Sequence, residues 1–231
     1  MIKVILWDID GTLLDFRPAE RHALLSSFEK ICPGECTDAM LEDYSAINRK
    51  YWEALERKEI TKAEVMVQRF EEFFGKYGID TALAKPFNAE YQVRLGDEVH
   101  FFPKAKETVE ALKQAGIRQY AVTNGTKVAQ DIKLKRSGLD QLFDGIYISE
   151  VAGYDKPDKR FFQKVFQEIG NYDKGEIIIV GDSLTGDMRG GNNAGIHTCW
   201  FNPQGLEKHV TVVTEHEIKS IDEVLSVIQK Y

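Results

Sequence analysis

The chain has 231 residues, 43% of them hydrophobic and 29% charged, which is typical of a globular protein with one sizeable core, or with a core and a smaller insertion. Its 30 basic and 37 acidic residues give a net charge of −7, which argues against a broadly basic surface and hence against a nucleic acid polymer as the partner. Because no apolar run is long enough to span a membrane, no export signal is evident and the three cysteines form no CxxC pair, we expect a cytoplasmic protein with reduced thiols and no membrane association.

The first predicted element is an apolar strand over residues 3–7, and Asp8 and Asp10 follow it directly. A strand this apolar is typical of a parallel sheet covered on both faces, so both carboxylates are expected at its carboxyl end, where ligands bind in open α/β sheets. Two anionic groups held together need a cation or a shared proton. We interpret them as a divalent-metal site in which one aspartate also reacts; an Asp-x-Asp-Gly turn ending the strand is the structural alternative.

Residues 18–96 carry a helical pattern of apolar residues with almost no strand signal. Breaks near residues 33–34, 58–61, 75 and 78 divide this segment into about four helices. Thr61 and Glu64 are spaced as a capping box at the start of the third helix.

From residue 103 onward, predicted strands and helices alternate. We expect strands at 119–123, 145–149, 177–180, 198–201 and 210–213, and helices at 104–115, 126–136, 158–169, 184–194 and 221–230. The alternation predicts an α/β fold whose core is a Rossmann-like, doubly wound parallel sheet. Because a long helical segment separates the first strand from the others, we predict a core of residues 1–15 and 100–231 and an inserted all-helical cap of residues 16–99 that overhangs the first strand end.

Polar residues follow three further strands. Thr123 and Asn124 offer a hydroxyl and an amide beside a helix start, which suits a phosphate oxygen, although both could simply cap the helix. Lys156 follows the third strand, but a single lysine is usually only solvated. Asp182 and Asp187 follow the fourth strand, and capping could explain either one. Since the carboxyl ends of parallel strands share one edge of the sheet, we interpret the whole set as catalytic.

The residue types favour Mg²⁺ over Zn²⁺, because hard oxygen ligands occur without a cluster of His or Cys. We expect Asp8 and Asp182 to bind the metal through carboxylate oxygens and Asp10 through its backbone carbonyl. A carboxylate can attack phosphorus to form an aspartyl-phosphate, while the metal and Lys156 neutralise negative charge. Asp10 is the candidate that protonates the leaving oxygen and later activates water.

Four motifs together resemble those of the haloacid dehalogenase-like hydrolase superfamily, across essentially the whole chain. They are DIDGTL at 8–13, VTNG at 122–125, YDKP at 154–157 and GDSLTGD at 181–187. In this sequence the resemblance implies one role for each of six residues: Asp8 as nucleophile, Asp10 as acid and base, Thr123 and Lys156 as phosphate contacts, Asp182 as metal ligand, and Asp187 as a carboxylate in or just behind the metal site. It also implies a mobile helical cap. The acid at position 10 disfavours dehalogenation, because dehalogenase members lack it.

Other segments are similar to the pyrimidine 5′-nucleotidase branch of this superfamily, namely residues 43–48 with Trp52, residues 148–150 and residues 194–202. The resemblance implies a Mg²⁺-dependent phosphomonoesterase whose small-molecule substrates are pyrimidine nucleoside monophosphates, non-standard ones included. We expect it to work as a monomer or homodimer. Asn48 and Trp52 could hydrogen-bond and stack on a base, although an aromatic residue at helical spacing is more often part of a core. A sugar-phosphate phosphatase, a phosphomutase and a non-catalytic binding protein stay as alternatives.

Overall fold

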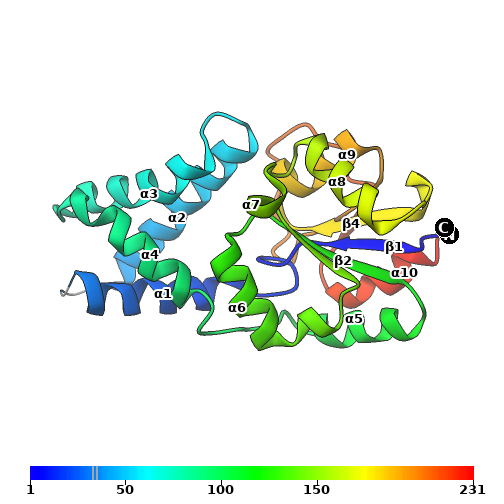
Figure 1. The fold of residues 1–231 in the computed structure, drawn as a ribbon, viewed down its shortest axis with the longest axis horizontal. Helices are drawn as coiled ribbons and strands as arrows, with labels where there is room; N and C mark the ends of the chain where they lie inside the picture. The colour runs from blue at the N-terminus through cyan, green and yellow to red at the C-terminus, as the bar shows by residue number, and fades with distance from the viewer. Residues whose placement is uncertain (33, 35) are drawn as a thin grey trace. The chain divides into compact units, whose positions relative to one another are not determined.

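The computed structural model describes residues 1–32, 34 and 36–231, which divide into two compact units (Figure 1). The sheet unit comprises Met1–Phe16 and Val99–Tyr231, and the helical unit comprises Arg17–Glu98. Among the described residues, no helix combines the length and the apolar character that a membrane span needs.

The described part of the sheet unit contains six parallel strands in the order β3-β2-β1-β4-β5-β6. They are β1 (Val4–Trp7), β2 (Arg118–Thr123), β3 (Gly145–Ile148), β4 (Ile177–Gly181), β5 (His197–Phe201) and β6 (His216–Ile218). The chain first adds strands on one side of β1 and then returns to the other side, so the direction of winding reverses between β1 and β4. Ligands of such sheets bind at the carboxyl ends of the strands beside this reversal. The predicted doubly wound parallel sheet is confirmed.

Helices cover both faces of this sheet (Figure 1). They are α5 (Ala105–Gln114), α6 (Lys127–Ser137), α7 (Ser149–Ala152), α8 (Lys159–Ile169), α9 (Arg189–Ala194) and α10 (Val224–Ile228). Side chains of β1 alternate between the faces: Ile5 and Trp7 pack with residues of α5 and α10, whereas Val4 and Leu6 pack with residues of α8. β1 itself is apolar and fully buried, and the first polar side chain after it is that of Asp8, just past the carboxyl end of the strand.

The strand predicted at 210–213 is wrong, because the edge of β5 is paired by His216–Ile218 instead. Asn192 holds the 210–213 segment from the side: its Nδ2 donates to Val213 O (3.1 Å), and Val213 N donates to its Oδ1 (3.0 Å). Val210 and Val212 pack against the core, which explains their apolar character without a strand. The helix predicted at 184–194 forms as a π-helical turn, Leu184–Met188, followed by α9.

The helical unit consists, in its described residues, of α1 (Phe16–Ile31, whose first residue belongs to the sheet unit), α2 (Asp38–Glu56), α3 (Lys62–Tyr77) and α4 (Ala84–Arg94), with a 3₁₀ turn at Thr81–Leu83. The predicted four helices are therefore confirmed. So is the capping box of α3, because Glu64 N donates to Thr61 Oγ1 (3.3 Å) and Thr61 N donates to Glu64 Oε2 (2.7 Å).

Aromatic side chains form the interior of the helical unit. Their ring centroids lie between 5.0 and 6.4 Å apart, mostly edge to face, in the range where aromatic pairs attract one another. The buried rings are those of Phe28, Tyr44, Phe70, Phe73, Phe74, Phe87 and Tyr91. The helical unit thus has a hydrophobic core of its own, separate from the two clusters that cover the sheet.

Candidate active site

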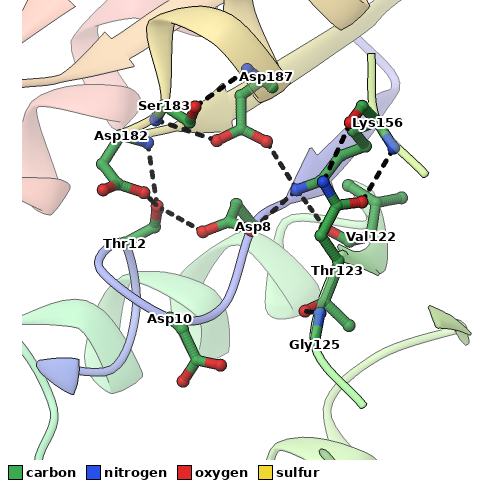
Figure 2. Close-up of polar contacts among 12 residues, drawn as sticks. Asp8, Asp10, Thr12, Val122, Thr123, Gly125, Lys156, Asp182, Ser183 and Asp187 are labelled. Carbon is green, nitrogen blue, oxygen red and sulfur yellow. Dashed lines mark hydrogen bonds and ion pairs between the residues drawn. The ribbon is translucent and has the colours of Figure 1, made fainter. Parts of the chain in front are cut away.

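Residues from four segments meet at the carboxyl edge of the sheet (Figure 2). Asp8 follows β1, Thr123 ends β2, and Asp182 follows β4, so the parallel strands themselves bring these three together. Lys156 reaches them from the loop between α7 and α8, where a cis peptide bond joins it to Pro157. The predicted convergence of these residues is therefore present in the structure.

Asp8 is only 7% exposed and uses both carboxylate oxygens. Its Oδ1 accepts a hydrogen bond from Lys156 Nζ (2.8 Å), and its Oδ2 accepts one from Thr12 Oγ1 (2.9 Å). Burial raises the pKa of Asp8 to about 6, even though the charge of Lys156 opposes this change. A nearby cation would stabilise the ionised form, which is the form that can attack an electrophile.

Lys156 is a buried cation between two carboxylates. Its Nζ donates to Asp8 Oδ1 (2.8 Å), Asp187 Oδ1 (2.6 Å) and the Val122 carbonyl (2.8 Å), which uses all three ammonium protons. Burial works to lower the pKa of Lys156, but the charges of Asp187 and Asp8 outweigh it and hold the pKa above its usual value. The lysine is therefore charged, and it neutralises the site.

The side chain of Asn124 positions Lys156. Asn124 Nδ2 donates to Lys156 O (3.0 Å), and Lys156 N donates to Asn124 Oδ1 (2.8 Å). The neighbouring Thr123 Oγ1 accepts from Gly125 N (3.0 Å), which leaves its proton for an acceptor such as a phosphate oxygen. A phosphate contact by Thr123 fits this arrangement, whereas the amide of Asn124 is already engaged; both contacts stay predictions.

Three carboxylates are placed to share a cation. Oxygens of Asp8, Asp182 and Asp187 all lie within 4.8 Å of one another. Thr12 Oγ1 is 2.9 Å from Asp8 Oδ2 and 3.2 Å from Asp182 Oδ1, and its single proton can serve only one of them at a time. Oxygen ligands without His or Cys suit Mg²⁺ better than Zn²⁺. The donor set thus fits the predicted metal.

Gly11 allows the first motif to approach Asp182 this closely. Its φ is +94°, a conformation that favours glycine, and a Cβ at this position would lie 2.6 Å from Asp182 Oδ2. Trp200 Nε1 fixes the other side of Asp182 by donating to its carbonyl oxygen (2.9 Å). Gly11 beside the carboxylate and Trp200 at the carbonyl oxygen therefore restrict the position of Asp182.

The carboxylate of Asp10 points away from the carboxylates of Asp8 and Asp182 (Figure 2). Its Oδ1 accepts from Lys133 Nζ (2.6 Å), and its Oδ2 accepts from Gln130 Nε2 (2.7 Å). The predicted metal contact of Asp10 runs through its backbone carbonyl, so the orientation of the side chain does not affect it, and the contact stays a prediction.

Sequence reasoning missed four residues of this site: Thr12, Gln130, Lys133 and Ser183. Thr12 lies inside the first motif, and Ser183 N donates to Asp187 Oδ2 (3.1 Å) inside the fourth, so both could have been suspected from the motifs. Gln130 and Lys133 gave only a weak signal, namely two polar residues one helical turn apart.

The predicted base contacts lie in the helical unit. Asn48 is buried, its Nδ2 donates to Glu20 Oε1 (2.8 Å), and Arg69 Nη1 donates to its Oδ1 (2.7 Å). The amide of Asn48 therefore links two buried, oppositely charged side chains. Trp52 is partly exposed. Contact of either residue with a base stays a prediction.

The sequence pattern of haloacid dehalogenase-like hydrolases matches residues 2–195, which is most of the chain and includes every motif residue named above. The chain belongs to the haloacid dehalogenase-like hydrolase family. This confirms the resemblance that the four motifs indicated, and as a member of this family the chain is an enzyme.

Two of the relatives that the chain resembles are named as pyrimidine 5′-nucleotidases. Pyrimidine 5′-nucleotidase PynA of Streptococcus pneumoniae is 35% identical over 231 residues, covering 99% of this chain and 95% of PynA. Pyrimidine 5′-nucleotidase YjjG of Escherichia coli is 29% identical, covering 78% of this chain and 81% of YjjG. The crystal structure of the hydrolase YfnB of Bacillus subtilis, bound to magnesium, superposes with a TM-score of 0.92 at 33% identity and covers 98% of both chains.

Proposed function

We propose that this hydrolase is a Mg²⁺-dependent phosphomonoesterase that acts on pyrimidine nucleoside monophosphates, including non-standard ones. The observation that carries the proposal is the setting of Asp8, a buried carboxylate that contacts a charged lysine and faces two further carboxylates able to share a cation. The names of PynA and YjjG support the phosphoric monoester class and favour a pyrimidine nucleotide as substrate.

In the proposed reaction, a carboxylate oxygen of Asp8 forms a bond to phosphorus as the bond from phosphorus to the ribose oxygen breaks. Asp10 gives its proton to that departing oxygen. Asp10 then takes a proton from a water molecule, whose oxygen attacks the aspartyl-phosphate and releases inorganic phosphate and the free Asp8 carboxylate. Thr123 donates to a phosphate oxygen, and Lys156 keeps the negative charge around Asp8 balanced throughout.

Asp8 and Asp182 would hold Mg²⁺ through their carboxylates and Asp10 through its carbonyl. The bound ion supplies the positive charge that allows a phosphate dianion to approach a carboxylate nucleophile. Asp187 lies within reach of the same ion and would add negative charge to the site, while Lys156 and Ser183 hold its oxygens in place.

Replacing Asp182 by asparagine should raise the Mg²⁺ concentration needed for half-maximal activity by at least about tenfold, because one anionic ligand is lost. Activity measured across a Mg²⁺ titration tests this. Glu107→Gln, which neutralises an exposed carboxylate of α5, is the matched control and should leave the requirement unchanged. An unaltered requirement in Asp182→Asn would remove Asp182 from the metal site.

A substrate panel tests the proposed specificity. We expect kcat/KM for uridine and thymidine 5′-monophosphates, and for 5-substituted analogues, to exceed that for glucose 6-phosphate or glyceraldehyde 3-phosphate by about tenfold or more, a typical result of pocket complementarity. EDTA should suppress all of these activities, and added Mg²⁺ should restore them. Highest activity on a sugar phosphate would replace the nucleotide assignment, and activity that EDTA leaves intact would contradict the metal requirement.

A further inference from the structure

Lys133 is a buried lysine that the proposed reaction does not use. Its side chain is 2% exposed, its Nζ donates to Asp10 Oδ1 (2.6 Å), and the same nitrogen lies 4.8 Å from the centre of the Phe16 ring. A buried ammonium group is costly unless it is paired, and here its ion-pair partner is the carboxylate of the proposed acid and base. The face of Phe16 also favours the cation where it lies.

Gln130 contacts the other oxygen of the same carboxylate. It is fully buried, and its Nε2 donates to Asp10 Oδ2 (2.7 Å). Its Oε1 is buried as well and has no hydrogen-bond partner among the described residues. A buried amide oxygen without a partner destabilises the fold. Gln130 thus directs its amide nitrogen, and not its oxygen, at Asp10.

Gly125, which follows Thr123 and Asn124, makes room for this contact. A Cβ on Gly125 would lie 2.2 Å from Gln130 Nε2, closer than any two such atoms can approach. The absence of a side chain at Gly125, the glycine of the second motif, therefore leaves the space in which the amide of Gln130 reaches Asp10.

We propose that Gln130 and Lys133 are positioning residues that fix the carboxylate of Asp10 for proton transfer; the inference rests on the proposed function, in which Asp10 is the acid and base. Each residue donates to a different oxygen, and both come from one face of α6, one turn apart. Two donors on two oxygens fix both the place and the rotation of a carboxylate, which a single donor cannot do. Proton transfer depends on such fixed geometry.

The inference predicts a dependence on the leaving group. A ribose oxygen leaves as an alkoxide and needs the proton of Asp10, whereas 4-nitrophenolate leaves readily without one. Loss of either positioning residue should therefore slow phosphoryl transfer from uridine 5′-monophosphate much more than transfer from 4-nitrophenyl phosphate. A residue with a merely structural role would affect both esters alike.

The experiment compares Lys133→Met and Gln130→Met with the wild type in single turnovers, with enzyme in excess over each ester and Mg²⁺ present. We expect transfer from uridine 5′-monophosphate to slow by about 10- to 100-fold, within the range of general acid catalysis, and release of 4-nitrophenolate to change less than about threefold. KM for the nucleotide should change little, and Lys133→Arg should recover most of the lost rate. Lys135→Met, an exposed lysine of the same helix, is the matched control.

Equal slowing on both esters, an effect on KM alone, or full activity of the variants on the nucleotide would overturn the inference. If Lys133→Met fails to fold, Gln130→Met carries the test alone, and Gly125→Ala supports it because the added Cβ would clash with Gln130 Nε2. Asp10→Asn separates the two proposals. If Asp10→Asn shows the dependence on leaving group and the α6 variants do not, only the positioning role fails; if Asp10→Asn lacks the dependence, the acid and base role fails and the positioning role with it.

Discussion

Replacing Asp8 by asparagine is expected to lower kcat by at least about 10³-fold on every phosphate ester, as loss of a covalent nucleophile does. Asparagine has nearly the same shape, but its amide is a poor nucleophile and carries no charge to bind Mg²⁺. The substitution therefore removes the bond-forming atom and a metal ligand together. Initial rates on 4-nitrophenyl phosphate, measured with saturating Mg²⁺, provide the test.

The fold should survive this change. Asp8 is a buried carboxylate near Asp187, and burial already disfavours its ionised form. Neutralising it leaves Lys156 paired with Asp187 (2.6 Å), so the free energy of unfolding should stay within about 1 kcal/mol of the wild type. A folded Asp8→Asn variant that keeps more than about a tenth of the wild-type rate would exclude Asp8 as nucleophile.

Replacing Lys156 by methionine is expected to abolish measurable turnover and to lower the free energy of unfolding by about 3–5 kcal/mol. The reason is electrostatic. Lys156 is 2% exposed and is the cation between Asp8 and Asp187, so its loss leaves two buried carboxylates facing each other without compensation. Urea unfolding of the metal-free protein measures the effect, because bound Mg²⁺ would replace part of the missing charge.

The double variant Lys156→Met with Asp187→Asn is the control for this explanation. It removes one of the uncompensated carboxylates, so it should be more stable than the single variant. Two results would show that Lys156 does not act by charge compensation. One is a free energy of unfolding of the single variant within about 1 kcal/mol of the wild type, and the other is a double variant that is less stable than the single variant.

The single substitution Lys156→Met should also alter the pH dependence of the free energy of unfolding. In the wild type, burial raises the pKa of Asp8 to about 6, well above the value of about 4 in an unfolded chain. Without Lys156 the pKa of Asp8 rises further, so the folded variant keeps a proton that the unfolded chain has released. Stability then falls as the pH rises through this range. Both proteins lose stability between about pH 4 and pH 6, but only the variant continues to lose it above pH 6, so the difference between variant and wild type should widen above about pH 6.

The residues around β1 and β4 could be predicted from sequence because their signals are local. A fully apolar strand followed directly by an aspartate indicates a buried parallel strand with a polar side chain at its carboxyl end. This pattern occurs at Asp8 and again at Asp182. Parallel pairing of β1 with β4 then brings the two carboxylates together without further information. The candidate cation ligands follow from these short patterns, whereas the doubly wound sheet follows from the alternation of strands and helices after residue 103.

Contacts between distant parts of the chain could not be predicted in this way. Gln130 and Lys133 lie in a polar helix and resemble solvated residues, yet both are buried and donate to Asp10, which lies 120 and 123 residues earlier in the chain. Asn124 suggested a helix cap, but its side chain pairs with the backbone of Lys156, 32 residues later. The strand expected at 210–213 failed for the same reason, because a side-chain contact from Asn192 decides where that segment lies.

The separate aromatic interior of the helical unit has a consequence for how this enzyme can diversify. Among the described residues, the buried rings of the helical unit and the clusters around the sheet have no member in common, so substitutions in the helical unit that preserve Phe28, Phe70, Phe74 and their neighbours are expected to leave the packing around β1 undisturbed. The insertion is thus a module in which evolution can lengthen helices, replace surface residues or substitute a different helical domain. The carboxylates at the strand ends would meanwhile keep the chemistry constant.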